Sequence, residues 1–217
     1  MKKSFAVIGL GRFGSSVAAT LFDMGQEVLA MDVDAARVEE IKDRVTMAIQ
    51  ADMRDERVLS KLDLPRFDAV LISIGGDVQS SIMATALCKE LGARYVIAKA
   101  ADALHAKLLT KVGADKVLLT EREAGARLAH SLVGSSIIDY LELSDEYSVS
   151  EISLPARWAG HSLDELKVRN TYDISVIAIR RGTQIIVKID PLGALQPEDV
   201  LVVIGENDAI QKIAGLR

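Results

Sequence analysis

The chain has 217 residues, of which 49% are hydrophobic and 26% charged, and its formal net charge is −5. This composition is ordinary for a globular protein, and the length suffices for one large domain or two smaller ones. The acidic balance, without a Lys/Arg run, argues against a nucleic-acid partner. The single cysteine, Cys88, excludes an intramolecular disulfide and suits a reducing compartment.

The N-terminal stretch MKKSFAVIGLG begins like a signal peptide. Its apolar run is short, however, and leads into glycines that suit a strand-to-helix turn. No uncharged apolar stretch reaches the roughly 18 residues of a membrane span. We therefore expect no direct membrane insertion, so that any membrane association passes through a partner protein.

The first 120 residues alternate between short β-branched apolar runs and segments of helical period. Phe13, Val17, Leu21 and Met24 illustrate the helical spacing, because they fall on one face of a helix. Continuous apolar strands alternating with helices predict a parallel sheet covered on both faces, and hence a doubly wound, Rossmann-like α/β domain. The predicted strands are Phe5–Ile8, Val28–Met31, Val45–Ile49, Ala69–Ile72, Tyr95–Ala98 and Lys116–Leu119.

Several polar residues stand where helices would begin. Asp34 and Asp102 are predicted N-caps, and Thr120 to Glu123 reads as a capping box that opens a helix through about Val133. The predicted helix Asp77–Leu91 carries apolar residues around much of its surface. Such a helix is buried on more than one side, either within one subunit or between the sheet and a partner subunit.

The pattern changes near Gly134. We expect a helical stretch over Ser135–Leu143, then a small β-rich α+β domain that opens a helix with the capping box at Ser162 and Glu165. The predicted domains are therefore 1–133, a helical connector 134–146, and 147–217. The second domain has four predicted strands and a last helix: Val149–Leu154, Ile174–Arg180, Gln184–Lys188, Val200–Ile204 and Asp208–Leu216.

Gly9, Gly11 and Gly14 form a G-x-G-x-x-G motif between the first strand and the first helix. In that context the motif predicts a nucleotide-binding loop: Gly9 for the turn, Gly11 for approach to a diphosphate, and Gly14 for close helix packing. The helix N-terminus offers N–H groups to the anion. Asp32 ends the second strand, where an acidic side chain binds ribose hydroxyls.

Arg12 within this loop has no obvious role in binding a dinucleotide. The two phosphate charges of a dinucleotide are largely neutralised by backbone N–H groups. A guanidinium suits bidentate contact with phosphate, so we hypothesise that Arg12 meets the terminal phosphates of ATP or senses their absence in ADP. The alternative is a solvated arginine on the helix surface.

Other residues at the carboxyl ends of strands have two interpretations each. Asp34 is an N-cap or a ribose contact; Asp52 caps the next helix or, with Met53, flanks the adenine. The pair Gly75-Gly76 after the fourth strand permits close approach of a nucleotide or is only a flexible turn.

Five motifs together resemble the RCK (regulator of K⁺ conductance) family, and within it the KtrA/TrkA-type cytosolic subunits of bacterial potassium transporters. The resemblance spans essentially the whole chain. It rests on FAVIGLGRFGSSVA (5–18), VLAMDVD (28–34), VLISIGGDVQSSIMATAL (70–87), KVGADKVLLTEREAGARLA (111–129) and LELSDEYSV (141–149).

The resemblance implies a cytoplasmic subunit, peripheral to the membrane, that binds ATP, ADP or NAD(H). It also implies dimers that assemble into an octameric ring under a membrane potassium pore, which nucleotide exchange gates. By residue match, nucleotide contacts fall on Gly9, Gly11, Arg12, Gly14, Asp32, Asp34, Asp52, Met53, Gly75, Gly76, Lys99, His105 and Glu121.

Some of these matched residues also have plainer interpretations. Lys99 is equally explained as a solvated strand-end lysine, and His105 as a histidine on a helix surface. Glu121 matches a position that holds a cation, Mg²⁺ being ordinary chemistry beside a triphosphate. Ala101 departs from the family, in which a polar residue is frequent. Arg169, Ile174 and Pro191 match loosely a cyclic di-AMP site of some relatives.

Two other functions remain open on the sequence. An NAD-dependent oxidoreductase would need a proton donor or base near the nicotinamide, and only His105 and Lys99 are candidates. A separate regulator of a potassium efflux channel is the other alternative. The second domain offers no catalytic constellation, so we expect a protein that is not an enzyme.

Overall fold

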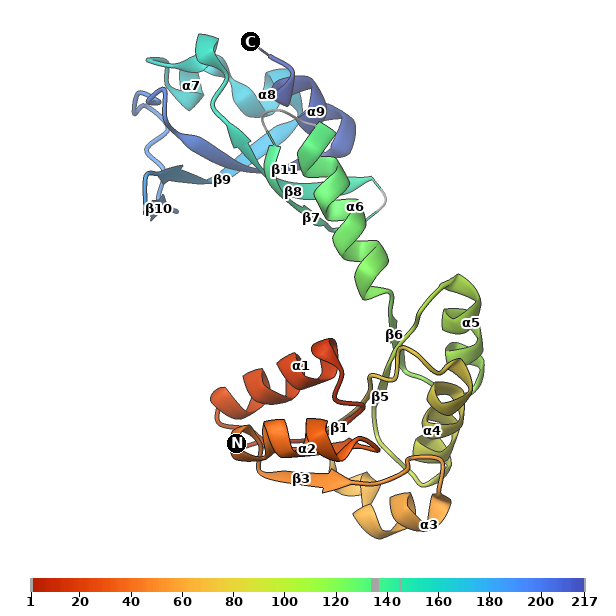
Figure 1. Ribbon diagram of the computed structural model, residues 1–217. Coiled ribbons are helices and arrows are strands. Elements are labelled where there is room, and N and C mark those ends of the chain that lie inside the picture. The colour runs from red at the N-terminus through yellow and green to blue at the C-terminus, as the bar shows by residue number, and fades with distance from the viewer. Residues whose placement is uncertain (1, 134–136, 145, 217) are drawn as a thin grey trace. The chain divides into compact units, whose positions relative to one another are not determined.

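The computed structural model describes residues 2–133, 137–144 and 146–216. Its contacts divide the chain into two compact units, Met1–Thr120 and Glu121–Arg217 (Figure 1). The helix α6 (Thr120–Val133) therefore groups with unit 2. The functional domain limits at 133 and 146 stay a prediction.

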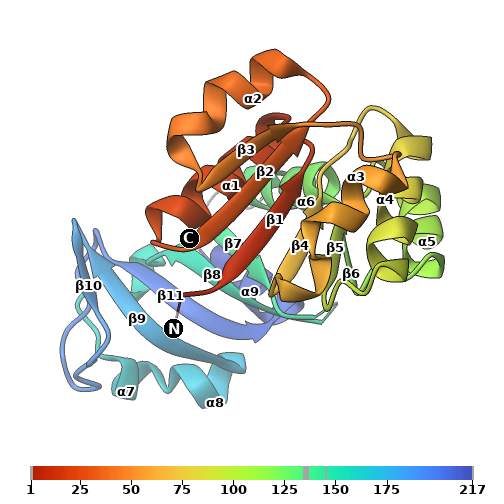
Figure 2. The ribbon, with the colours of Figure 1, turned by 90° about the horizontal axis from the view of Figure 1, so that it is seen from below.

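Unit 1 is a six-stranded parallel sheet in the order β3-β2-β1-β4-β5-β6, which confirms the predicted doubly wound topology (Figure 2). The chain builds outward from β1 to β3, then returns to start β4 on the other side of β1. Ligands of such sheets bind at this reversal, beside the carboxyl ends of β1 and β4. The strands are β1 (Ser4–Ile8), β2 (Glu27–Asp32), β3 (Met47–Gln50), β4 (Ala69–Ile72), β5 (Val96–Lys99) and β6 (Lys116–Leu118).

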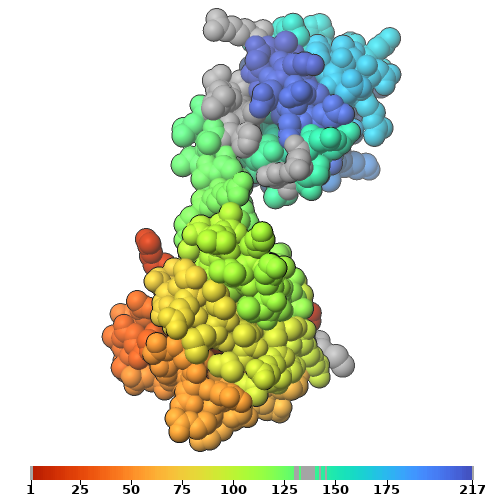
Figure 3. Space-filling view, turned by 90° about the vertical axis from the view of Figure 1, so that its right-hand side faces the viewer, coloured from red at the N-terminus to blue at the C-terminus, as the bar shows by residue number. Residues whose placement is uncertain are grey.

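Alternate residues of each strand enter two different cores. Val7 and Ala30 pack in one core with α1 and α2, whereas Ile8 and Met31 face the other, with α3, α4 and α5. Helices thus cover both faces, and α4 and α5 gather on one face of the unit (Figure 3). The helices are α1 (Arg12–Asp23), α2 (Ala35–Ile41), α3 (Glu56–Leu59), α4 (Val78–Glu90) and α5 (Ala103–Lys111).

Helix starts follow the local chemistry predicted for them. Asp34 caps α2 by accepting the Ala36 N–H at 2.9 Å, and Asp102 caps α5 by accepting the His105 N–H at 2.8 Å. Asp77 likewise caps α4 through the Ser80 N–H at 3.0 Å. On α4, Ala84 and Cys88 are fully buried, while Met83 is 38% exposed.

The helix expected over 135–143 is wrong for the residues described there, 137–143. Residues Ile137–Glu142 form strand β7, which pairs antiparallel with β8 (Tyr147–Ser153). The β-branched and aromatic residues of the run Ile-Ile-Asp-Tyr-Leu favour a strand. Pairing with β8 gives hydrogen-bond partners to alternate backbone groups of this run. Residues 135 and 136 of the expected helix lie outside the described residues.

Unit 2 is a five-stranded antiparallel sheet, in the order β10-β9-β11-β8-β7, with short helices against it. Its core includes Trp158, Ile174 and Leu201, each at most 1% exposed. The predicted capping box is present, with Ser162 and Glu165 exchanging hydrogen bonds at the start of α7. The remaining elements are β9 (Ile174–Arg181), β10 (Gln184–Ile186), β11 (Val200–Glu206), α7 (Leu163–Leu166), α8 (Val168–Tyr172) and α9 (Asn207–Ala214).

Within the described ranges, none of the helices combines the length and the apolar character that crossing a membrane requires.

Candidate functional site

The glycine loop between β1 and α1 has the geometry that the motif predicts. Gly9 has φ +93°, and a Cβ there would lie 2.8 Å from the Ser73 carbonyl group. A Cβ on Gly14 would lie 1.9 Å from the Gly9 carbonyl oxygen, so only glycine lets the helix start this close to the loop. Around Gly11, by contrast, a Cβ would find no atom within 4 Å. The loop backbone is therefore open at Gly11, where the diphosphate approach was predicted.

Few side chains near the N-terminus of α1 offset its positive helix dipole. Gly11, its N-cap, offers no side-chain hydrogen bond, and the first turn carries no acidic residue. The positive end of the helix dipole therefore remains available to an anion. Arg12, the first residue of α1, is exposed, and no carboxylate of the described residues lies within 4.0 Å of its guanidinium. This end of the helix thus carries one full positive charge beside the open loop.

Asp32 at the end of β2 is 3% exposed and holds the loop directly. Its Oδ2 accepts the Leu10 N–H at 2.6 Å, and its Oδ1 accepts the Asp34 N–H at 2.9 Å. Arg37 on α2 stands 3.4 Å from Asp32 and 3.5 Å from Asp34. These contacts with Leu10 and Arg37 were missed in the sequence because they join residues on separate elements. Asp34 serves as the N-cap; its ribose contact stays a prediction.

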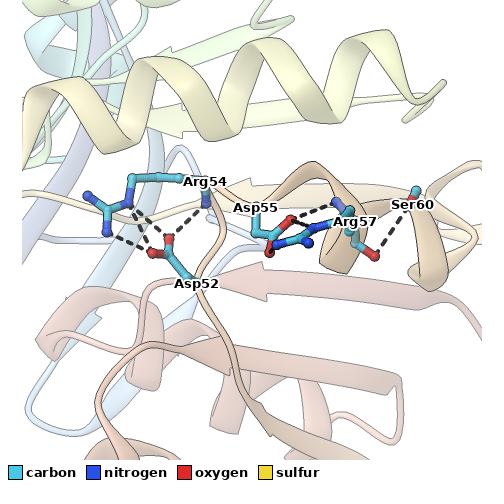
Figure 4. Close-up of polar contacts among 5 residues, drawn as sticks. All are labelled: Asp52, Arg54, Asp55, Arg57 and Ser60. Carbon is cyan, nitrogen blue, oxygen red and sulfur yellow. Dashed lines mark hydrogen bonds and ion pairs between the residues drawn. The ribbon is translucent and has the colours of Figure 1, made fainter.

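The segment after β3 carries two Asp–Arg pairs in tandem (Figure 4). Asp52 accepts bonds from the Arg54 backbone N–H at 2.9 Å and from its guanidinium at 2.7 Å. Asp55 does the same with Arg57 and is the residue that caps α3. The alternative that Asp52 caps this helix is therefore wrong, because the cap stands three residues later.

The Arg54 guanidinium, by hydrogen bonding to the Asp52 carboxylate, lowers the pKa of Asp52 to about 2. The Arg54 guanidinium also interacts electrostatically with the carboxylate of Asp77, the N-cap of α4. Met53, predicted to flank the adenine, is 4% exposed and packs in the core with Leu59 and Ile72. The structure thus brings Asp52 to the surface of this edge and puts the Met53 side chain inside.

Lys99 at the end of β5 reaches the loop after β4 and the first turn of α1. Its Nζ lies 3.6 Å from the position of a Cβ on Gly75 and 5.9 Å from the centroid of the Phe13 ring. The Nζ thus points to the sheet edge at which a ligand would bind, and a contact between Lys99 and a nucleotide stays a prediction. Gly76 has open space where a Cβ would stand. Gly75 and Lys99 consequently lie together at the strand reversal that the fold offers to a ligand, near the first turn of α1.

His105 is 1% exposed, so the alternative of a surface histidine is wrong. Its Nδ1 accepts the Ala101 N–H at 3.1 Å, which assigns the proton of the neutral ring to Nε2. Burial lowers the pKa of His105, and the nearby Asp102 opposes this shift only in part. Its buried Nε2 has no hydrogen-bond partner among the described residues.

Glu121, the predicted cation ligand, is exposed in the first turn of α6 and belongs to unit 2. The described residues contain no group of three or more His, Cys, Asp or Glu side chains arranged to hold a metal ion. A cation at Glu121 would therefore need oxygen ligands from elsewhere, such as phosphate or water.

A second pocket, of about 530 Å³, lies in unit 2 between α7–α8, β9 and the turn at Pro191. Arg169, Ile174 and Pro191, which the sequence grouped loosely, all line it. Its charged lining residues are Lys167, Arg169 and Asp164, and apolar Val168 and Val176 stand beside them. The pocket thus combines positive charge with apolar surface, the two features that a cyclic dinucleotide needs.

Comparison with known proteins now decides the family. Residues 5–120 match the TrkA-N domain model, and residues 149–216 match the TrkA-C domain model. The chain is 44% identical over 212 residues to the Ktr system potassium uptake protein C of Bacillus subtilis, covering 98% of this chain and 96% of that protein. The chain belongs to the Ktr family of potassium uptake proteins. The family resemblance predicted from the sequence is confirmed.

A second Ktr relative supports this assignment, and one solved structure shares the fold. The Ktr system potassium uptake protein A of the same bacterium is 35% identical over 97% of this chain and 95% of that protein. A solved structure of the GsuK channel bound to NAD superposes with a TM-score of 0.69 at 14% identity. It is matched over 99% of this chain and 40% of that channel chain, and it shows that the fold is shared.

Proposed function

We propose that this Ktr family member is a nucleotide-sensing regulatory subunit of a membrane potassium uptake system and not an enzyme. It lies in the cytoplasm, peripheral to the membrane, and is held there by the pore subunit that it gates. It assembles as dimers and then as an octameric ring. Residues 1–133 bind the nucleotide, residues 134–146 connect, and residues 147–217 form the regulatory and dimerisation domain.

The observation that carries this proposal is the exposed Arg12 at the open glycine loop. A dinucleotide loop needs backbone N–H groups, whereas an additional full charge at the helix start suits the extra charge of a triphosphate. The crevice holds a second cation, Lys99, near Gly75. Phosphate recognition by two cations, with no carboxylate of the described part of the chain within 4.0 Å of Arg12, supports ATP and ADP as the ligands.

Gating by nucleotide exchange needs only a difference in affinity. ATP shifts the ring towards one shape if it binds that shape more tightly than the other. A tenfold preference is about 1.4 kcal/mol per site. Over eight concerted sites this amounts to roughly 11 kcal/mol, which is ample to switch a ring between shapes.

The test is calorimetric titration of ATP, ADP and NADH, with Mg²⁺, into the wild type and into Arg12→Ala. Losing a charge-assisted contact should weaken ATP about tenfold or more, with a clearly smaller effect on NADH. Arg44→Ala is the matched control, because Arg44 pairs with Asp23 on the surface. Equal losses for ATP and NADH would contradict the role of Arg12. Tight NADH binding with little affinity for ATP would instead favour the oxidoreductase alternative.

Glu121 is proposed as the protein ligand of the cation that accompanies ATP. The prediction is that Glu121→Gln removes the Mg²⁺ dependence of ATP binding while leaving ADP binding without Mg²⁺ unchanged. Glu123→Gln, in the same helical turn, is the control.

The pocket of unit 2 is proposed as a cyclic di-AMP site. Its 530 Å³ volume, two cations and apolar wall support this ligand class. Titration of cyclic di-AMP should give binding that Arg169→Ala weakens about tenfold. No heat of binding at tens of micromolar would remove the proposal without touching the nucleotide site of unit 1.

A further inference from the structure

Unit 1 has another pocket, of about 220 Å³, at the edge of the sheet opposite the glycine loop. Ser4 and Glu27, the first residues of β1 and β2, line it, so it stands at the amino ends of the strands. Its apolar wall comes from Leu29, Ile49, Leu62 and Phe67. None of these residues belongs to the proposed nucleotide site.

The pocket exists because the connection from β3 to β4 contains too little helix to cover this part of the sheet. Where α4 provides 13 helical residues, this connection has α3 with four residues and two 3₁₀ turns of three residues, Ser60–Leu62 and Leu64–Arg66. The apolar face of the edge strand β3 is thus left partly open beside the 3₁₀ turns. Met47 on β3, which also lines the pocket, is 56% exposed.

The charged residues around the pocket are unbalanced. Lys61 and Arg66 line it, and no carboxylate of the described residues lies within 4.0 Å of either side chain. The acidic residue on the wall, Glu27, stands 3.9 Å from Lys2. The pocket therefore presents two positive charges that are not ion-paired to any described carboxylate, in a protein of net charge −5.

Arg66 is also held in place. Its guanidinium carbon stands 5.1 Å from the centroid of the Phe67 ring, within cation–π range. The Ser4 hydroxyl donates to the Arg66 carbonyl oxygen at 3.1 Å, which ties the 3₁₀ turn to the start of β1. A cation oriented beforehand loses less freedom when an anion binds it.

We propose that this pocket binds a small organic anion. An apolar, ring-sized body would lie against Leu29, Ile49 and Leu62, and its carboxylate or phosphate would meet Lys61 and Arg66. The volume is below the roughly 300–1,000 Å³ of drug-sized sites, so the ligand class is a single-ring metabolite rather than a nucleotide. The site is independent of the nucleotide function proposed above.

The test uses methyl NMR of the full-length protein, saturated with ADP and titrated with phenyl phosphate. The methyl groups of Met47, Ile49 and Leu62 should shift together, whereas those of Val17 on α1 should not. Benzyl alcohol lacks the anion and inorganic phosphate lacks the ring, so each should bind at least about tenfold more weakly. Comparison with benzoate separates a carboxylate ligand from a phosphate ligand.

The double variant Lys61→Gln/Arg66→Gln should weaken phenyl phosphate about tenfold or more, because both charge-assisted contacts are lost. Both residues are exposed, and unchanged methyl shifts elsewhere confirm the fold. Lys107→Gln on α5 is the matched control. Undiminished binding in the double variant, or shifts that spread over the whole surface, would overturn the proposal.

Discussion

Two glycines of the same loop should respond in opposite ways to an added methyl group. Gly14→Ala places its Cβ against the Gly9 carbonyl oxygen, and we expect a loss of about 3 kcal/mol in the free energy of unfolding, the upper end for overpacking. Gly11→Ala meets no atom within 4 Å and has φ −68°, so stability should change little while nucleotide affinity falls. Urea denaturation and calorimetry separate the two effects; equal destabilisation would contradict this account.

His105 should make the stability of the protein depend on pH. Its pKa is lowered from 6.5 by burial, so as the pH falls the unfolded chain takes up the proton first. The contribution of the neutral His105 ring to the free energy of unfolding is fully present above pH 6.5. It is lost as the pH falls towards the lowered pKa. His105→Asn keeps an acceptor for the Ala101 N–H but does not titrate, so the decline in stability between pH 7 and 5 should be shallower.

The exposed His161 supplies the control for this experiment. His161→Asn removes an exposed imidazole that stands 3.6 Å from Glu165, and His105→Asn should flatten the pH dependence of unfolding more than this control does. A variant at His105 that kept the full slope would assign the pH dependence to other groups.

At the scale of elements, β9 is joined to the turn before β11 by a buried ion pair. Arg181 donates to Asp199 through two nitrogens at 2.7 and 2.8 Å, and the Asp199 side chain is fully buried. Arg181→Ala leaves this charge without its partner. We expect a cost of about 3 kcal/mol, the lower end for a broken buried pair, because a third of the Arg181 side chain is exposed.

The neighbouring pair Arg180–Glu151 is the matched comparison. Both of its side chains are about 30% exposed, so Arg180→Ala should cost about 1 kcal/mol. Hydrogen exchange of the β9 and β11 amides measures the loss of stability in both variants directly. A cost at Arg180 equal to that at Arg181 would show that burial of Asp199 is not what matters.

The elements also show what a sequence can predict. The central strands of unit 1, such as Ala69–Ile72, are continuous apolar runs that are largely buried, and a run of that kind indicates a strand without tertiary information. The helix expected at β7 is wrong because antiparallel pairing with β8, through pairs such as Tyr140–Ser150, completes a strand that its β-branched and aromatic residues favour.

Some residues of the candidate site can likewise be predicted from the sequence, and others cannot. Gly9, Gly11 and Gly14 follow from a motif with fixed spacing, and the space around each is as the motif predicts. The ribose contact of Asp32 stays a prediction, and only the fold shows its bond to the Leu10 N–H. The burial of His105 and Met53 could not be predicted, since it depends on which side chains the folded elements bring against them. Arg37, Lys61 and Arg66 carry no motif at all; only the fold shows what each of them faces.

At the scale of the whole molecule, the proposed ring sets an expected mass. Eight copies of 23.4 kDa make about 187 kDa, which light scattering at micromolar concentration would register. Met83→Asp on α4 should lower this mass if that face meets a partner subunit. Phe22→Asp on α1, which is 37% exposed against 38% for Met83, is the control and should not. A monomeric wild type would refute the assembly.

Trp158 makes this chain an optical reporter of one unit alone. It is the single tryptophan, it is 1% exposed, and its ring centroid lies 5.1 Å from that of Tyr172 on α8. Because α8 also lines the pocket of unit 2, occupancy of that pocket should alter the emission of this indole without any added dye. Unit 1 contains no indole, so its ligands can change the fluorescence only by acting on unit 2. An emission change on adding ATP would therefore measure communication between the two units.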